Sequence, residues 1–214
     1  MTLSNGAKRP TKSLRTGVGI RQGGKQYDSI HRSIAKAALV ELSIDGFERL
    51  DFRRVADRAG VSERTAYRHY PKKIELAIAG IKQMPDYTGW GEGDDAAADR
   101  LRRGLTIGAA HRDYLGPVMA TAMLNRESEP ELLKTLSEHV LAVREHQIQL
   151  FLDDGQRTGE IRPDIKASTI ASLTDGLLMA HHRGSPSLGT GKTRVNRLFA
   201  AIWPLIATDA HLND

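Results

Sequence analysis

The sequence predicts an all-α protein with a small N-terminal domain and a larger C-terminal helical bundle. Apolar side chains recur at intervals of three and four residues through most of the chain. No segment shows the alternating polarity, with valine, threonine and aromatic residues, that marks a strand. Glycine and proline fall between the apolar runs, and 214 residues suffice for one small and one larger module.

The chain begins with a predicted basic arm, residues 1–26. The arm has almost no apolar pattern, so it cannot offset the entropy cost of ordering, and we expect it to be disordered. It contains no acidic residue and six basic ones: Lys8, Arg9, Lys12, Arg15, Arg21 and Lys25. Two interpretations remain open, because such an arm can bind DNA phosphates or stay solvated.

The next segment, residues 27–83, is predicted to form a compact helical domain. Ile30, Ile34 and Leu42 share a helical spacing that stops at Gly46. Asp51 and Ser62 are suited to cap the N-termini of two short helices, because their side-chain oxygens can accept backbone hydrogen bonds. The predicted helices are 28–45, 52–59, 63–69 and 72–83.

A linker at 84–94, rich in glycine, precedes the second domain at 94–214. Its predicted helices are 95–111, 116–126, 130–157, 164–182 and 192–208, with a flexible loop at 184–191. Pro117 is expected in the first turn of its helix, where proline is tolerated.

Charge is divided unevenly along the chain. Residues 84–214 hold 14 basic and 18 acidic side chains, whereas the N-terminal part is basic. This division is typical of a protein that binds a polyanion with one end. The chain has no cysteine, which excludes disulfides, thiolate zinc sites and a cysteine nucleophile. No signal peptide or apolar run of about 18 residues is present, so we expect a cytoplasmic protein without a membrane partner.

The strongest functional motif spans residues 55–70, Val-Ala-Asp-Arg-Ala-Gly-Val-Ser-Glu-Arg-Thr-Ala-Tyr-Arg-His-Tyr. A tight turn between crossing helices needs a residue that tolerates positive φ, and Gly60 does so because it lacks a Cβ. Val61 and Tyr70 are expected in the core. The second helix would then present its remaining large side chains outward: Glu63, Arg64, Thr65, Tyr67, Arg68 and His69. A short helix of this kind is typical of the recognition helix of a helix-turn-helix, which enters the major groove of DNA.

This motif resembles the helix-turn-helix of the TetR family of transcriptional regulators. The family pattern is filled identically or conservatively, without a gap, by Val55, Ala56, Ala59, Gly60, Val61, Ser62, Thr65, Tyr67, His69, Tyr70, Lys73 and Leu76. Asp51 and Ala66 depart from the pattern, which has threonine and leucine at those positions. The resemblance therefore implies an N-terminal three-helix DNA-binding domain containing the helix-turn-helix.

The resemblance also implies roles in DNA binding. Contacts with the DNA backbone are implied for Thr65, Tyr67, His69 and Lys73, and contacts with bases for Glu63, Arg64 and Arg68. Ser62 and Tyr70 complete the predicted DNA-binding set.

A second, weaker resemblance lies at 159–164, Gly-Glu-Ile-Arg-Pro-Asp, and implies a C-terminal bundle whose last two helices pair with those of a second subunit. Two apolar stripes agree with such a homodimer interface, because helices this apolar must bury those faces. They consist of Ile170, Leu173, Leu177, Leu178, Val195, Leu198, Phe199, Ile202, Trp203 and Ile206. A core within one chain is the alternative.

Family resemblance also implies a small-molecule effector bound in the second domain. Candidate residues for its pocket are Trp90, Tyr114, Met119, Met123 and Met179, although methionines at helical spacing are commonly plain core. We expect neither a metal nor a cofactor, and no enzyme activity. His139 and His146 stand two helical turns apart, too far to share one ion.

The function expected from the sequence is a repressor that binds a palindromic double-stranded operator as a homodimer and is released by an effector. The alternative is an effector-independent DNA-binding activator or architectural protein.

Overall fold

The computed structural model describes residues 18–85, 87–110, 112–182 and 191–212. Within these residues the regular structure is helical, and extended backbone pairs only at an isolated bridge between Ile161 and Ala207. The helices are α1 (Val18–Asp45), α2 (Phe52–Ala59), α3 (Glu63–His69), α4 (Lys73–Ile81), α5 (Ala97–Ala110), α6 (Arg112–Leu124), α7 (Pro130–Leu136), α8 (Ala142–Thr158), α9 (Ala167–His182) and α10 (Gly191–Ile206). A π-helical turn, η1 (Ser137–Leu141), joins α7 to α8, and a 3₁₀ turn, η3 (Asp209–His211), follows α10. The all-α prediction is confirmed.

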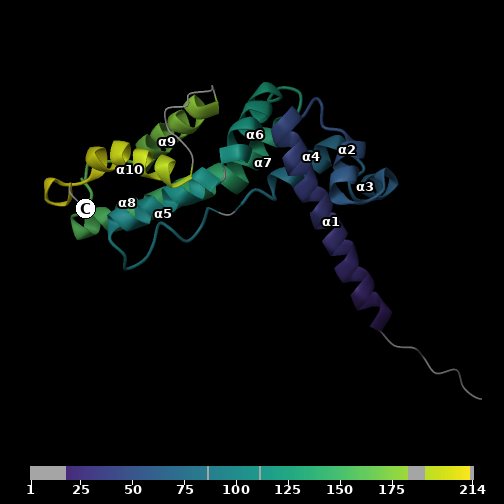
Figure 1. The fold of residues 1–214 in the computed structure, drawn as a ribbon, viewed down its shortest axis with the longest axis horizontal. Coiled ribbons are helices and arrows are strands. Elements are labelled where there is room, and N and C mark those ends of the chain that lie inside the picture. The colour runs from purple at the N-terminus through teal and green to yellow at the C-terminus, as the bar shows by residue number, and fades with distance from the viewer. Residues whose placement is uncertain (1–17, 86, 111, 183–190, 213–214) are drawn as a thin grey trace, which may run out of the picture.

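The molecule is elongated, with two groups of helices at its ends. Figure 1 shows α2, α3 and α4 around α1 at one end, and α5, α8, α9 and α10 at the other. α6 and α7 lie between them.

α1 is longer than the sequence predicts. The predicted helix began at residue 28, but α1 begins at Val18, so residues 18–26 are helical rather than disordered. Once the buried half around Ile34 and Leu42 has formed, each further residue adds a hydrogen bond at little extra cost. This N-terminal half projects from the body of the protein (Figure 1). The remainder of the predicted arm, residues 1–17, lies outside the described part of the chain.

The first apolar core joins the N-terminal helices to α6 and α7. Leu76 of α4, Val118 of α6 and Leu132 of α7 are all fully buried in one cluster with Ile34. The backbone N–H of Phe47 also donates a buried hydrogen bond of 2.8 Å to Oγ1 of Thr121 in α6. The core therefore does not divide at the predicted linker, and α6 and α7 brace the N-terminal helices.

A second core is formed by α5, α8, α9 and α10. The segment predicted as a linker takes part in it, because Trp90 is buried against Phe151 of α8. A Cβ at Gly104 of α5 would lie 2.6 Å from the Trp90 ring, so the glycine makes room for it. The Gln147 side-chain oxygen accepts hydrogen bonds from the backbone of Trp90 and Gly91, each 3.3 Å long. Residues 90 and 91 are consequently fixed to the bundle.

Two predicted helices of the second domain differ in the structure. The helix predicted at 116–126 begins at Arg112, so Pro117 lies inside α6 instead of in its first turn and removes one helical hydrogen bond. The helix predicted at 130–157 is interrupted by the π-helical turn Ser137–Leu141. A π turn adds one residue to a helix without a polar or glycine signal, so an apolar repeat does not reveal it. No helix in the described part of the chain is long and apolar enough to cross a membrane.

Candidate DNA interface

α2 and α3 meet in a tight turn at Gly60, which caps α2 in the left-handed conformation with φ of 69°. The backbone N–H groups of Gly60 and Val61 donate to the carbonyls of Asp57 and Ala56, at 3.2 Å and 3.0 Å. These bonds close the end of α2 and redirect the chain into α3, as a left-handed cap does. The predicted turn geometry is confirmed.

Both helices of the motif are capped as the sequence predicts. The Asp51 carboxylate accepts a hydrogen bond from the backbone of Arg54 at 3.1 Å. The Ser62 hydroxyl accepts one from the backbone of Thr65, also at 3.1 Å, and lies 2.8 Å from the Thr65 hydroxyl. α3 therefore begins at a fixed residue, which fixes the positions of the side chains that follow.

α3 buries one face and exposes the other. Ala66 is completely buried against the first core, whereas Tyr67 is 47% exposed and stacks on Phe52 of α2 with ring centres 3.9 Å apart. The small Ala66 side chain, a departure from the family pattern, lets α3 lie close to the core. Four predicted DNA-binding side chains besides Tyr67 are exposed: Ser62, Glu63, Arg64 and Arg68, with Thr65 half-buried.

His69 differs from the prediction, whereas Tyr70 lies in the core as expected. His69, expected to project outward, is only 6% exposed, and Tyr70, predicted both in the core and in the DNA-binding set, is 6% exposed. The cause is α1, whose unpredicted N-terminal turns place Tyr27 over the His69 ring with centroids 4.2 Å apart. His31 stacks on Tyr70 at 4.3 Å, and the Tyr70 hydroxyl donates to the His31 carbonyl at 3.2 Å.

These four rings, Tyr27, His31, His69 and Tyr70, form what we call the ring cluster, which ties α1 to the end of α3. Within it the two histidine Nδ1 atoms are 3.3 Å apart, so one ring carries a proton on Nδ1 that the other accepts. Burial lowers the pKa of His69, and the nearby His31 and Arg68 lower it further. Burial also raises the pKa of Tyr70 to about 12. Both side chains are thus held neutral at pH 7.

Tyr27 and His31 were not among the predicted site residues. The available signal was their separation of four residues, which places both on one side of a helix. Tyr27 directly follows the segment 1–26 that the composition predicts to be disordered, so the spacing alone does not place it on a helix.

Several basic side chains near the motif are already paired. Arg54 binds both Glu41 and Asp45, and Arg58 Nε lies 2.8 Å from Glu41. Lys73, predicted to contact the DNA backbone, donates to the Glu48 carbonyl at 2.7 Å and lies over the Phe47 ring. Arg64 and Arg68 of α3, in contrast, have no ion pair among the described residues. The two guanidinium groups of α3 are therefore available to a ligand.

The residues predicted to line an effector pocket do not lie together. Trp90 is buried in the second core, whereas Tyr114 and Met119 pack against the first. Met123 is 45% exposed, and the side chain of Met179 lies outside the described part of the structure. Sequence spacing could not predict this separation, because it depends on how the two cores divide the helices.

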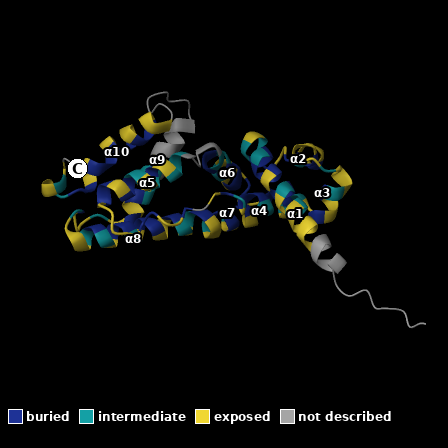
Figure 2. Cartoon of the chain, turned by 60° about the horizontal axis from the view of Figure 1, so that its bottom comes forward, coloured by how far each residue is buried: buried dark blue, intermediate teal, exposed yellow. Residues whose placement is uncertain are grey.

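Most residues predicted for the dimer interface are buried within one chain. Ile202, Ile206 and Trp203 are at most 2% exposed, and α10 packs its apolar stripe against α5. Ile170, Val195, Leu198 and Phe199 are also buried, Leu173 is half-buried, and the side chains of Leu177 and Leu178 lie outside the described residues. The buried residues of both apolar stripes therefore belong to a core within one chain, which was the alternative to a dimer interface. Figure 2 shows that α10 also has exposed residues, drawn in yellow, beside its buried ones.

Within the described residues, no three histidine, aspartate or glutamate side chains gather as a metal site would require. The capped turn followed by α3 places the exposed Arg64 and Arg68, which have no ion pair among the described residues, on a helix with a fixed start. A helix-turn-helix of this form, mounted on a helical bundle, defines the chain as a DNA-binding regulator by class.

Comparison with known proteins agrees with this class. Residues 34–79 match the model of bacterial regulatory proteins of the tetR family. A search of curated proteins finds no match. Among solved structures, a transcriptional regulator from Rhodococcus sp. assigned to the TetR family is 24% identical, with 85% of this chain and 100% of that chain covered and a TM-score of 0.64.

Two further structures have the same fold. A TetR transcriptional regulator from Chloroflexus aurantiacus J-10-FL is 18% identical over 86% of this chain and 98% of its own, with a TM-score of 0.68. A TetR-family regulator from Cytophaga hutchinsonii is 15% identical over 86% of this chain and 98% of its own, with a TM-score of 0.63. The resemblance seen in the sequence is confirmed for the N-terminal helices, where residues 34–79 match the tetR family model, and the chain has the fold of these TetR-family structures.

Proposed function

We propose that this regulator is a repressor that binds a palindromic operator as a homodimer and is released by a small molecule. The observation that carries the proposal is the division of α3 into a buried face at Ala66 and an exposed face with unpaired Arg64 and Arg68. Arginine forms two parallel hydrogen bonds with guanine in the major groove, so it suits a base-reading position.

Backbone contacts are assigned to the hydroxyl-bearing residues around α3. Ser62, Thr65 and Tyr67 lie at the start and on the exposed side of the helix. Lys73 reaches the same side only by giving up its bond to the Glu48 carbonyl. His69 acts indirectly, because its ring is covered by Tyr27.

A selection of binding sites from random DNA with purified protein tests the proposal. A dimer with two α3 helices predicts an inverted repeat whose half-sites are separated by about 10 base pairs or a multiple of that spacing. Recovery of sequences without a shared motif would reject operator binding.

Effector release requires a ligand with different affinities for the two states of the protein. A small molecule that raises the melting temperature and also weakens operator binding supports release. The alternative, an effector-independent activator or architectural protein, is favoured by the separation of Trp90 from Tyr114 and Met119 in different cores. Discrete protection of an operator indicates regulation, whereas continuous coverage of DNA indicates an architectural role.

A further inference from the structure

We propose that Arg64 and Arg68 act as a pair, the arginine ridge, and that each operator half-site contains two G·C base pairs no more than two steps apart. Each guanidinium of the ridge reads one of the two guanines. The inference rests on the proposed operator binding and deepens it, because it names the bases that α3 recognises.

The ridge runs along the side of α3 opposite to the core. Ala66 is fully buried, and His69 is buried beneath Tyr27. Arg64 precedes Ala66 by two residues and Arg68 follows it by two, so each lies about 160° around the helix from it. Both arginines are exposed, and neither forms an ion pair among the described residues. The packing of α3 therefore presents two cations on its outermost side.

The flanks of the ridge carry hydroxyl groups. Thr65 and Tyr67 lie about 100° from Ala66 on opposite sides of α3, between the buried face and the ridge. Tyr67 is held there by its stacking on Phe52, and the Thr65 hydroxyl lies 2.8 Å from that of Ser62. Hydroxyl side chains bind phosphate oxygens and so position a protein on DNA without reading its sequence.

This order of side chains matches the cross-section of the major groove. The groove is about 12 Å wide, and an α-helix with its side chains is about 10–12 Å across. A helix in the groove therefore has a phosphate wall along each flank and base edges in front of its outermost side. When the hydroxyls face the walls, the ridge faces the bases. Arginine binds the O6 and N7 atoms of guanine with two parallel hydrogen bonds, so each member of the ridge selects guanine.

The distance between the two arginines limits the distance between the two guanines. Four residues of α-helix rise by about 6 Å, and each base pair adds about 3.4 Å along the DNA axis. The two guanidinium groups therefore reach base pairs that are at most about two steps apart. The Ser62 cap, which accepts a hydrogen bond from the Thr65 backbone at 3.1 Å, holds the turn that contains Arg64.

Site selection from random DNA, run separately with the wild type, Arg64→Gln and Arg68→Gln, tests the ridge. The wild type should select two G·C pairs within two steps in each half-site. Each variant should lose the guanine preference at one of these pairs, and a different one in each, and favour adenine there, because glutamine forms two hydrogen bonds with adenine. Affinity for the wild-type operator should fall about 10- to 100-fold in each variant, the discrimination expected of one bidentate contact.

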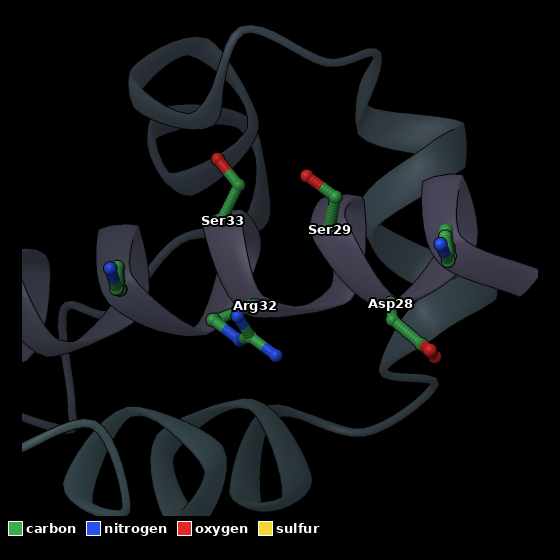
Figure 3. Close-up of a pocket in the computed structure, with 6 residues that line it drawn as sticks. Asp28, Ser29, Arg32 and Ser33 are labelled. Carbon is green, nitrogen blue, oxygen red and sulfur yellow. The ribbon is translucent and has the colours of Figure 1, made fainter.

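Arg32→Gln is the matched control, because it removes the same charge from another exposed arginine. Arg32 lies on α1 and forms no ion pair among the described residues. Figure 3 shows it on the other side of α1 from Ser33, whose hydroxyl donates to the Ala59 carbonyl of α2 at 3.4 Å. Arg32→Gln should therefore keep the wild-type base preferences. Thermal unfolding verifies that each variant is folded.

A selected motif without two G·C pairs within two steps would overturn the arginine ridge while leaving operator binding intact. An equal loss of affinity for all DNA sequences in Arg64→Gln and Arg68→Gln would also overturn it, because that result indicates phosphate contacts. The same holds for a base preference that Arg32→Gln changes as much as they do. A wild-type protein that selects no DNA motif rejects the proposed function itself.

Discussion

His69 links the N-terminal half of α1 to the recognition helix through a buried contact that depends on protonation. The two Nδ1 atoms at 3.3 Å share one proton, and a proton on each of them would set two donors against each other. Arg68 next to His69 adds a further positive charge. The ring cluster is therefore expected to weaken in acid.

The lowered pKa of His69 predicts the direction of this pH dependence. An unfolded histidine has a pKa of about 6.5, and the folded value lies below it, so the unfolded chain takes up the proton first. The stabilisation is complete above pH 6.5 and decreases as the pH falls through 6.5 toward the folded pKa. Urea unfolding at several pH values measures it.

A matched pair of variants isolates this contribution. His69→Phe, which keeps a ring in the stack, should lose less free energy of unfolding on acidification than the wild type does. His146→Phe, at an exposed histidine of α8, should keep the wild-type pH dependence. Equal pH dependence in wild type and His69→Phe would exclude His69 as the source.

Arg68 is assigned to base reading because it is exposed, unpaired and located on α3. Arg68→Ala should weaken binding to the selected operator by about 1–3 kcal/mol and relax the preference at one base pair of each half-site. Binding to the operator and to single-base variants measures both effects. Arg126→Ala, at an exposed arginine beyond α6, is the control; an Arg68→Ala protein with unchanged specificity would refute the assignment.

For single residues, the sequence predicts which side chains of α3 face outward, with the exception of His69. Glu63, Arg64 and Arg68 are exposed as expected from helical spacing and the capping residue. The burial of His69 was not predictable, because the ring that covers it belongs to Tyr27, more than forty residues earlier in the chain. Local periodicity contains no information on such a contact.

At the scale of elements, the turn at Gly60 depends on backbone conformation alone. Its φ is 69°, and an added Cβ would meet nothing within 4 Å, so substitution introduces strain without a clash. Gly60→Ala should lower the free energy of unfolding by about 1–2 kcal/mol. Gly108→Ala, inside α5 with equally open space, should instead raise it by about 0.5–1 kcal/mol. Denaturant unfolding of both variants gives the comparison, and a Gly60→Ala protein as stable as wild type would contradict it.

Short capped helices were the most predictable elements. α2 and α3 agree with their predicted ranges because Asp51, Ser62 and Gly60 mark their ends chemically. The start of α1 and the π turn between α7 and α8 differ from the predicted ranges. Neither position has a capping residue or glycine that would mark it in the sequence. The start at Val18 depends on helix propagation, and the π turn depends on how α7 and α8 pack.

In the whole molecule, the apolar stripe of α10 is buried as predicted. The helix that packs against this stripe was not predicted. A stripe shows that a face is covered without showing what covers it, and here α5 packs against it within the second core. The outward face of α10, with Ala200, Ala201 and Leu205, is exposed in the single chain. We propose that this face forms the contact of the proposed homodimer.

The dimer prediction follows from that assignment. Leu205 is 53% exposed, so Leu205→Glu should leave the chain folded but shift it from dimer to monomer and weaken operator binding. Ile202→Glu, in contrast, places a charge in the core and should unfold the bundle. Sedimentation velocity with circular dichroism distinguishes the two outcomes. A folded Leu205→Glu dimer with wild-type affinity would show that another face forms the contact.

The first core makes the helix-turn-helix part of a larger unit. Because Val118 of α6 and Leu132 of α7 are buried with Ile34 of α1, a displacement of α6 or α7 must move the N-terminal helices. Sequence composition separates two domains at 84–94, but the packing that connects them depends on which faces of α6 and α7 meet α1 and α4.

Hydroxyl-radical footprinting of the selected operator tests whether α3 lies in a DNA groove. We expect two symmetric protected patches about one helical turn apart or a multiple of it, with Arg68→Ala weakening both. Uniform protection along the DNA, or a footprint that Glu63, Arg64 and Arg68 substitutions leave unchanged in strength and sequence, would contradict it.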